Sequence, residues 1–311
     1  MPSLIRTGVL LAALTAVFVA AGFLIAGKTG LIIAFPVALA INAYAYWFSA
    51  DLLLRGYGAR PVTRSTDPAL HGLVAEMASR ASLPTPRVYL IDSPQPNAFA
   101  TGRNPANAAI AVTTGLVRLL TRDELAGVIS HELAHVRNYD TLIMTVAASI
   151  AGAVAMLADP RLVFGSTPRD RQGQSNGPGL IGGLLIIILA PLAAALVQMA
   201  ISRTREYEAD RLGAAISGQP LRLADALMKI HQGVRQTRNP AAEARPATAL
   251  LFIINPLFGS RMSEWFATHP PTGERVRRLR LMAGTVGGAE IGRLARAAGA
   301  PGAVPGAVWR G

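Results

Sequence analysis

Four long stretches of apolar residues stand out from the polar segments of this sequence. Residues 7–27 and 31–50 carry no charged side chain, and each stretch is long enough to cross a bilayer as a helix. The intervening Lys28-Thr29-Gly30 predicts a tight turn. A signal peptide is the competing interpretation of the first stretch, but a second apolar stretch follows it without a cleavage site between them. We therefore predict that residues 1–54 form a transmembrane hairpin.

Two further apolar stretches occur in the middle of the chain. Residues 180–201 have full spanning length, and Pro191 is expected to kink this helix rather than end it. Residues 142–158 are at the short end for spanning, and their length also suits a buried core helix. The polar segment 159–179 between the two stretches is typical of a flexible loop. We expect residues 142–201 to form a second hairpin, so that an even number of spans returns the chain to the side that it left.

The segments 55–141 and 202–282 have the composition of one soluble domain, which the second hairpin interrupts. Helical periodicity dominates both segments, whereas short apolar runs at 88–91 and 109–113 predict strands. The expected fold class is therefore mainly α with a small β-sheet and four transmembrane helices in two hairpins. Residues 283–311 are rich in Gly, Ala and Pro, and we expect this tail to be disordered.

A further extended stretch lies between the two predicted strands and is bounded by Pro94, Pro96 and Pro105. Flanking prolines suit an edge strand, whose outer backbone groups have no partner strand. Such an edge can hold an extended peptide by main-chain hydrogen bonds. An ordinary loop fits the same pattern equally well. The stretch consists of Asn97, Ala98, Phe99, Ala100 and Thr101.

Composition narrows the class of protein. Of the 311 residues, 51% are hydrophobic and only 15% are charged, which favours a membrane protein. The net charge of +12 fits either nucleic acid or anionic lipid. Because no basic motif with interleaved aromatic residues occurs, we expect lipid as a partner and no nucleic acid. Arg55, Arg60 and Arg64 follow the first hairpin, and this places the soluble domain in the cytoplasm. The absence of cysteine excludes disulfides, thiolate metal ligands and a cysteine nucleophile.

The strongest chemical motif is His131-Glu132-Leu133-Ala134-His135, on a helix that a capping box of Thr121 and Glu124 should begin. Two histidines four residues apart lie on one helix face and can bind one metal ion. Zinc in catalytic sites takes three protein ligands and leaves a fourth position for water. Glu132 is then a candidate general base for that water.

A third ligand is needed, and the segment after the fourth apolar stretch offers candidates. Glu206 and Asp210 are four residues apart and share a helix face, whereas Glu208 points elsewhere. One carboxylate could bind the metal while the other orients a ligand histidine. A charged, solvated helix face is the alternative, since Arg203 and Arg211 flank the pair. The residues alone leave both interpretations open.

At this point the chain resembles the HtpX-type membrane zinc metalloproteases, relatives of the eukaryotic CAAX-processing endopeptidases. The resemblance covers nearly the whole chain, including the order of the four apolar stretches. The matching motifs are NAFATG at 97–102, VTTGL at 112–116, SHELAH at 130–135, SRTREYEAD at 202–210 and HPPTGER at 269–275.

The resemblance implies a zincin-like (gluzincin) catalytic domain. In such a domain Zn2+ would be bound by His131, His135 and Glu206, with Glu132 as the general base. Asp210 would match the family's aspartate that orients a ligand.

Two residues of the last motif have less defined roles in the family. The resemblance implies that His269 and Arg275 lie near the active site, where they would contact the substrate or the transition state. It also implies that the stretch 97–101 is an edge strand that aligns the substrate.

The predicted activity is that of a multi-pass zinc endopeptidase of the cell membrane, with its site on the cytoplasmic side. The resemblance implies that it cleaves cytoplasmic parts of damaged or misfolded membrane proteins. One alternative is a processing protease for lipidated peptides. A second alternative is a membrane scaffold with an inert metal site. The sequence predicts no particular oligomeric state.

Overall fold

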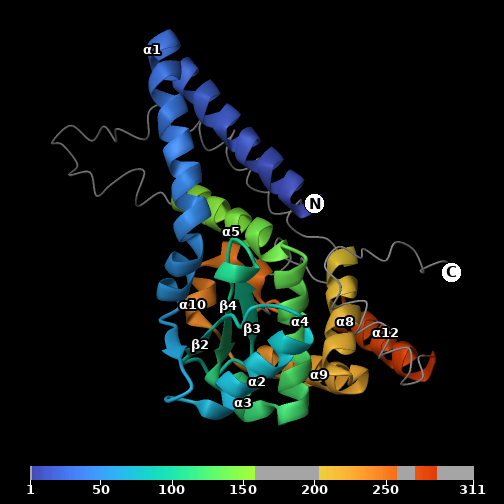
Figure 1. The fold of residues 1–311 in the computed structure, drawn as a ribbon. Coiled ribbons are helices and arrows are strands. Elements are labelled where there is room, and N and C mark those ends of the chain that lie inside the picture. The colour runs from blue at the N-terminus through green and yellow to red at the C-terminus, as the bar shows by residue number, and fades with distance from the viewer. Residues whose placement is uncertain (1, 158–202, 258–269, 286–311) are drawn as a thin grey trace.

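The computed structural model describes residues 2–157, 203–257 and 270–285, and two unequal parts make up this region (Figure 1). A helical hairpin projects from a body in which helices pack around a small sheet. The fourth predicted apolar stretch, the loop before it, and the tail from residue 286 onward lie outside the described residues. Helices predominate, and the predicted fold class, mainly α with a small β-sheet, is confirmed.

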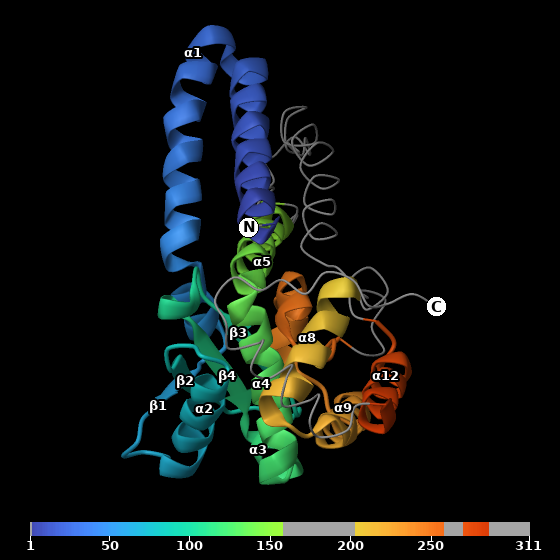
Figure 2. The same ribbon diagram turned by 45° about the vertical axis from the view of Figure 1, so that its right-hand side comes forward.

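The hairpin is formed by α1 (Pro2–Gly56), whose helical geometry is broken at Ala26 and Gly27. Gly27 has φ +57° and ψ −138°, a conformation that only glycine adopts readily. The two arms lie side by side in Figures 1 and 2. The turn was predicted at Lys28-Thr29-Gly30 and lies slightly earlier, because Gly27 is the residue that tolerates the required backbone angles.

A polar contact and small residues hold the two arms of α1 together. The Asn42 side-chain amide donates to the Leu11 carbonyl at 3.1 Å and to the Thr15 hydroxyl at 2.8 Å. Near the turn, Gly22 and Gly30 approach so closely that a Cβ on either would clash with backbone of the other. Close approach of small residues and side-chain hydrogen bonds between helices are the contacts that stabilise helix pairs in membranes.

One segment within the described residues, Ala26–Gly56, is long and apolar enough to cross a membrane. Its large apolar side chains point outward, and they include Ile32, Phe35 and Trp47. An apolar helix that exposes such side chains would be unstable in water. The third predicted stretch forms α5 (Asp140–Leu157), and its beginning, from Leu142 to Ala148, is buried against the body.

The sheet has four strands in the order β1-β2-β4-β3. Their bounds are β1 (Arg60–Val62), β2 (Arg87–Ile91), β3 (Ala98–Thr101) and β4 (Ala109–Thr113). β2 and β4 are parallel, while β1 and β3 are antiparallel to their neighbours. The two predicted strands are confirmed as β2 and β4, and the stretch that was open between strand and loop forms β3 at one edge of the sheet.

Alternating residues of the sheet pack into two different hydrophobic cores. Ala98, Ala100 and Val112 pack with the helices on one face, whereas Phe99 and Ala111 pack with α5 and the end of α1 on the other. The sheet is therefore covered on both faces, and the helix that carries the histidines lies on the first of them. The short strands β3 and β4 are both buried along their whole length.

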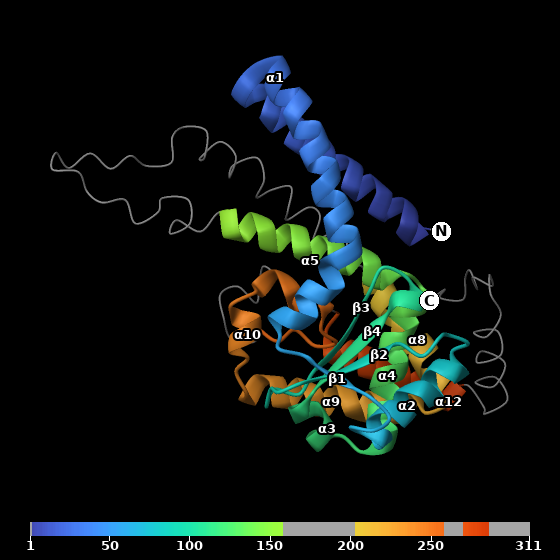
Figure 3. The ribbon, with the colours of Figure 1, turned by 60° about the vertical axis from the view of Figure 1, so that its left-hand side comes forward.

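Several of the other helices pack around this sheet, whereas α12 lies further out and packs on α9 and α8 (Figures 1 and 3). Asp67 caps α2 by accepting a hydrogen bond from the Leu70 amide, with Pro68 at the first helical position. The remaining bounds are α2 (Pro68–Arg80), η1 (Pro105–Asn107), α3 (Thr114–Leu119), α4 (Arg122–Arg137), α8 (Arg203–Ser217), α9 (Pro220–Gln236), α10 (Pro240–Glu243), η2 (Pro246–Leu251) and α12 (Thr272–Thr285). Because α12 continues to Thr285, the predicted boundary of the tail at residue 283 falls within a helix.

Candidate metal site and active site

α4 is the central helix of the body, and its sequence explains its start and its depth. Thr121 and Glu124 form the predicted capping box, in which each side chain binds the backbone of the other. Lys229 of α9 adds an ion pair to Glu124 at 2.7 Å. Every residue from Glu124 to Val136 is buried. The histidines of this helix are therefore held inside the protein rather than on its surface.

α8 brings the third candidate ligand to the two histidines. The Nε2 atoms of His131 and His135 are 3.2 Å apart, and Glu206 carboxylate oxygens lie 3.5 Å from His135 and 3.9 Å from His131. All three ligand atoms fit within 4.8 Å of one another. Gly213, one turn after Asp210, makes this approach possible, because a Cβ there would lie 2.8 Å from the His131 backbone.

The opposite nitrogen of each imidazole faces a carboxylate. His131 Nδ1 lies 3.0 Å from Asp210 Oδ1, and His135 Nδ1 lies 3.2 Å from Asp140 Oδ2. With the proton of each neutral imidazole on Nδ1, toward its carboxylate, the Nε2 lone pairs would face each other and Glu206. Arg275 approaches this group from one side, with Nη2 3.5 Å from His131 Nε2 and Nη1 3.7 Å from Glu206, and the three ligand atoms still converge on one point. The donor set therefore fits a divalent metal ion.

The buried ionisable groups shift one another's pKa in this site. Burial lowers the pKa of His131 to about 4. Burial acts in the same direction on His135, but Asp140 and Glu206 outweigh it and raise that pKa to about 9. Burial, reinforced by Glu206, raises the pKa of Glu132 to about 7. The protonated, cationic form of His135 is thus favoured, because the imidazole lies between the carboxylates of Asp140 and Glu206.

Glu132 points to the edge of the sheet. Its carboxylate accepts a hydrogen bond from the backbone N–H of Ala100 in β3. Glu132 is buried, as is the whole of β3. The candidate general base therefore lies between the metal ligands and the predicted substrate strand.

Arg275 is completely buried behind the metal ligands, in α12. Its Nε and Nη2 donate to the two oxygens of Asp210, both at 2.8 Å, and its Nη1 donates to the Ile253 carbonyl at 2.9 Å. Nη1 also lies 3.7 Å from Glu206. Burial raises the pKa of Asp210, but the arginine outweighs burial and holds that pKa below its usual range. Arg275 therefore keeps Asp210 ionised against His131.

The outer edge of β3 already has partners within the chain. The Ile253 amide donates to the Ala98 carbonyl at 3.0 Å, and the Asn97 side chain donates to the Ile254 carbonyl at 2.8 Å. On the far side, the Thr101 hydroxyl binds that of Thr145 in α5 at 2.9 Å. The segment Phe252–Ile254 thus covers the first part of this edge, before Ala100, whose amide binds Glu132. The role of the stretch Asn97–Thr101 in holding a substrate stays a prediction.

Sequence reasoning missed Asp140. It lies five residues after His135, at a spacing that does not share a helix face with it, and only the bend after α4 brings it back to the imidazole. Its signal in the sequence was weak: one acid directly after the helix that carries the metal motif. His269, a predicted active-site residue, lies outside the described residues.

The profile of peptidase family M48 matches residues 64–283, from just after the hairpin to α12. The chain belongs to peptidase family M48. As an M48 peptidase it is a metalloprotease, and His131, His135 and Glu206 form its possible metal site.

A named relative of this M48 peptidase is the Protease HtpX homolog of Acidiphilium cryptum (strain JF-5). The two are 55% identical over 283 residues, which cover 91% of this chain and 98% of the relative. The predicted HtpX-type resemblance is thereby confirmed. Among solved structures, that of S. mikatae Ste24p is similar at 18% identity with a TM-score of 0.48. The alignment covers 88% of this chain and 62% of Ste24p.

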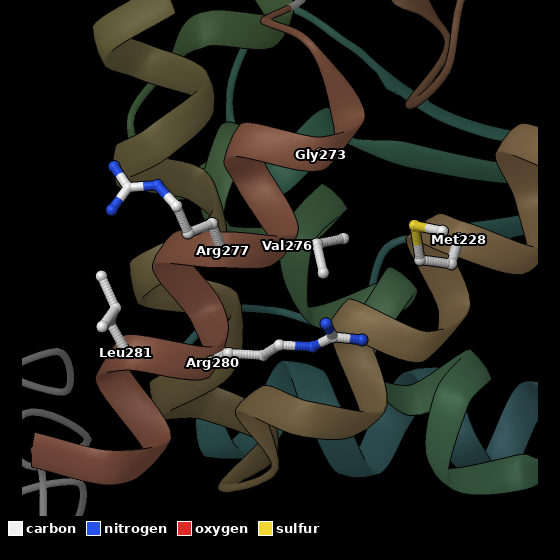
Figure 4. Close-up of a pocket in the computed structure, with 6 residues that line it drawn as sticks. All are labelled: Met228, Gly273, Val276, Arg277, Arg280 and Leu281. Carbon is white, nitrogen blue, oxygen red and sulfur yellow. The ribbon is translucent and has the colours of Figure 1, made fainter.

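The M48 peptidase also has a shallow groove of about 470 Å³ between α9 and α12 (Figure 4). Figure 4 shows Val276 and Arg280 pointing toward the helix that carries Met228. The described residues that line this groove include no acid, histidine or nucleophile, whereas the site on α4 brings together two histidines and two glutamates. Its lining residues are Met228, Gly273, Val276, Arg277, Arg280 and Leu281.

Proposed function

We propose that this protein is a membrane-bound zinc endopeptidase in which His131, His135 and Glu206 hold the metal ion. The observation that carries the proposal is the convergence of these three buried ligand atoms within 4.8 Å, beside the carboxylate of Glu132. Two imidazoles and one carboxylate are a ligand set of catalytic zinc sites, which keep a further position open. The relative from Acidiphilium cryptum is named as a protease, and this name supports the same activity.

Glu132 is proposed to accept a proton from the attacking water and then to deliver it to the leaving amine. Zinc at the three ligands would polarise that water and the scissile carbonyl. A carboxyl group with a pKa raised toward 7 can both accept and release a proton near neutral pH. The hydrogen bond from the Ala100 amide holds this carboxylate at the edge of β3, where the peptide is proposed to lie.

Asp210 and Arg275 are proposed to position His131. The family resemblance implied that Arg275 contacts the substrate or the transition state. Its guanidinium donors are engaged by Asp210 and the Ile253 carbonyl, so a supporting role fits its contacts better. His269 is retained as the candidate for transition-state contact.

The stretch Asn97–Thr101 is proposed to align the substrate. Because Phe252–Ile254 covers the first part of this edge, a peptide would pair with the strand near Ala100, beside Glu132. Binding along the whole edge would require the substrate to replace the contact between Ile253 and Ala98. The proposed pairing is therefore confined to the short part of the strand near Ala100.

The membrane arrangement is proposed to comprise four spans in two hairpins, with the site on the cytoplasmic side. The exposed apolar face of α1 supports the first of these hairpins, and α5 runs across its base (Figure 3). A site this close to the base of the hairpin suits substrates that are themselves in the bilayer. We propose that these are the cytoplasmic parts of damaged or misfolded membrane proteins.

The test is the substitution Glu132→Gln in the full-length protein, purified in detergent. The variant should bind zinc as the wild type does and should lose cleavage by at least about 100-fold, since general-base catalysis contributes about this much or more. Glu208→Gln is the matched control, because Glu208 pairs with Arg211 on the outer side of α8. Cleavage by Glu132→Gln at the wild-type rate would contradict the mechanism.

The same preparation distinguishes the alternatives. Removing the metal with a chelator should abolish cleavage, and adding zinc should restore it, whereas an inert scaffold would bind zinc without cleaving anything. A destabilised membrane protein should be cut faster than a prenylated peptide. Preference for the prenylated peptide would favour the processing protease instead.

A further inference from the structure

The bend between α4 and α5 brings a second carboxylate into the metal site. Asp140 is the first residue of α5 and is 3% exposed. Its Oδ2 lies 3.2 Å from His135 Nδ1, and its Oδ1 lies 3.6 Å from Arg205 of α8. This one side chain therefore contacts a ligand histidine on α4 and the residue that directly precedes Glu206 on α8.

An unusual backbone conformation places Asp140 there. Tyr139 has φ +60°, in the left-handed region that residues with a side chain seldom adopt. Its amide donates to the Val136 carbonyl at 3.2 Å, while the amide of Asn138, the C-cap, donates to Ala134 at 3.0 Å. These bonds end α4 and turn the chain back toward His135. Glycine is the common residue at such a position, so the tyrosine holds a strained conformation.

We propose that Asp140 is the positioning residue of the second metal ligand, the counterpart of Asp210 at the first. This inference rests on the proposed function. The carboxylate fixes the His135 proton on Nδ1 and aims the Nε2 lone pair at the metal. Through Arg205 it also ties the histidine to the helix that supplies Glu206. Because Asp140 begins α5, the first turn of a helix that packs against the hairpin sets the geometry of a metal ligand.

The experiment measures metal affinity directly, by competition with a chromophoric chelator, on the full-length protein in detergent. Asp140→Ala should weaken zinc binding by about 10–100-fold, the usual effect of removing the partner of a ligand histidine. Asp140→Asn should weaken it less, because an amide oxygen still accepts from Nδ1. The absorption spectrum of the cobalt-loaded protein should change in Asp140→Ala, since the orientation of one ligand changes.

The matched control is Asp67→Ala, which also removes an aspartate from the start of a helix, α2. It should lower thermal stability yet leave zinc affinity and the cobalt spectrum unchanged. Tyr139→Gly should keep zinc affinity, because glycine adopts the same backbone angles. Tyr139→Val should weaken zinc binding although Asp140 is retained, because a β-branched residue resists those angles.

The outcomes distinguish a failure of the proposed function from a failure of the proposed role of Asp140. If wild type binds no divalent metal, the proposed function fails. If wild type binds zinc tightly and folded Asp140→Ala binds it equally well, the function stands and the role of Asp140 is wrong. Equal loss of affinity in Asp140→Ala and Asp67→Ala would show a general loss of structure and would also overturn the inference. Should Asp140→Ala fail to fold, Asp140→Asn and the two Tyr139 variants decide the question.

Discussion

At the scale of single residues, Arg275 and Asp210 form a buried ion pair with two hydrogen bonds of 2.8 Å. Arg275→Met should leave Asp210 as an uncompensated buried charge, which lowers the free energy of unfolding by about 3–5 kcal/mol. The measurement is thermal or denaturant unfolding of the metal-free protein. Arg277→Met is the matched control: this neighbour on α12 pairs with Glu274 at the surface, and its loss should change stability little.

A double variant separates the effect of the stranded charge from the effect of the changed side-chain shape. Adding Asp210→Asn to Arg275→Met removes the stranded charge and should recover part of the lost stability. The double variant should still bind zinc more weakly than the wild type, because His131 has lost its carboxylate. If Arg275→Met unfolds at the wild-type midpoint, the buried ion pair does not contribute as proposed.

A pH prediction follows from Glu132, whose pKa is raised from its ordinary 4.5 to about 7, chiefly by burial. A raised carboxyl pKa means that the folded state holds its proton more tightly than the unfolded chain does. The resulting stabilisation is fully present below pH 4.5, and it is lost as the pH rises toward 7. In metal-free protein, wild type should therefore lose stability relative to Glu132→Gln between about pH 5 and pH 6.5. A difference in unfolding midpoint that stays constant over this interval would contradict the raised pKa.

The sequence predicted the site residues unevenly, for physical reasons. His131, Glu132 and His135 follow from helical spacing alone, because all three lie within one turn and a half of one helix. Glu206 needed the resemblance, since nothing local ties α8 to α4. Asp140 was missed because its contact depends on the backbone angles of a single residue, Tyr139, and no side-chain pattern encodes them.

At the scale of elements, the site depends on how closely α8 packs against α4. Gly213→Ala should push the helices apart, because the new Cβ would lie 2.8 Å from the His131 backbone. We expect a loss of about 1–3 kcal/mol of stability, typical of overpacking, together with weaker zinc binding as Glu206 moves away. Unfolding and chelator competition measure the two effects.

The control for this prediction is Gly72→Ala in α2, where a Cβ meets nothing within 4 Å. Alanine is the better helix former, so this change should stabilise the protein by roughly 0.5–1 kcal/mol and leave zinc affinity alone. Zinc affinity that is unchanged in Gly213→Ala would mean that the spacing of α4 and α8 does not set the position of Glu206.

Elements were easier to predict where their signals are local. The capping box that begins α4 and the Asp67-Pro68 start of α2 are present as expected. β3 could not be told from a loop, because its identity as a strand depends on pairing with β4. Its covered edge was also unpredictable, since Ile253 lies about 150 residues further along the chain.

At the scale of the whole molecule, the hairpin and the body meet through aromatic and apolar packing. Tyr57, just after α1, contacts both Phe99 of β3 and Phe252 beside η2, with ring centroids 5.9 and 5.4 Å apart. Its hydroxyl group also hydrogen-bonds to Thr248. The base of the α1 hairpin is thus packed directly against β3, the strand whose Ala100 amide hydrogen-bonds to Glu132. In the proposed membrane arrangement, this packing places the site near one membrane surface.

Which surface that is can be tested, because the chain has no cysteine and any introduced thiol is unique. Thr29 directly follows the break in α1, and Ser65 lies in the loop after β1; both side chains are exposed. The arginines that precede Ser65 favour the cytoplasm. A membrane-impermeant maleimide should therefore label Thr29→Cys in intact cells, and it should label Ser65→Cys only after the cells are lysed.

The cysteine-free parent must remain unlabelled in both conditions, and each variant must keep its zinc affinity so that the fold is known to be intact. Labelling of Ser65→Cys in intact cells would show that the whole body, including Glu132, lies on the outer side of the membrane. The reason is geometric: the body is packed against the base of α1, so no part of the site can lie on the opposite side of the bilayer from Ser65. Such a result would exclude cytoplasmic substrates while leaving the metal chemistry untouched.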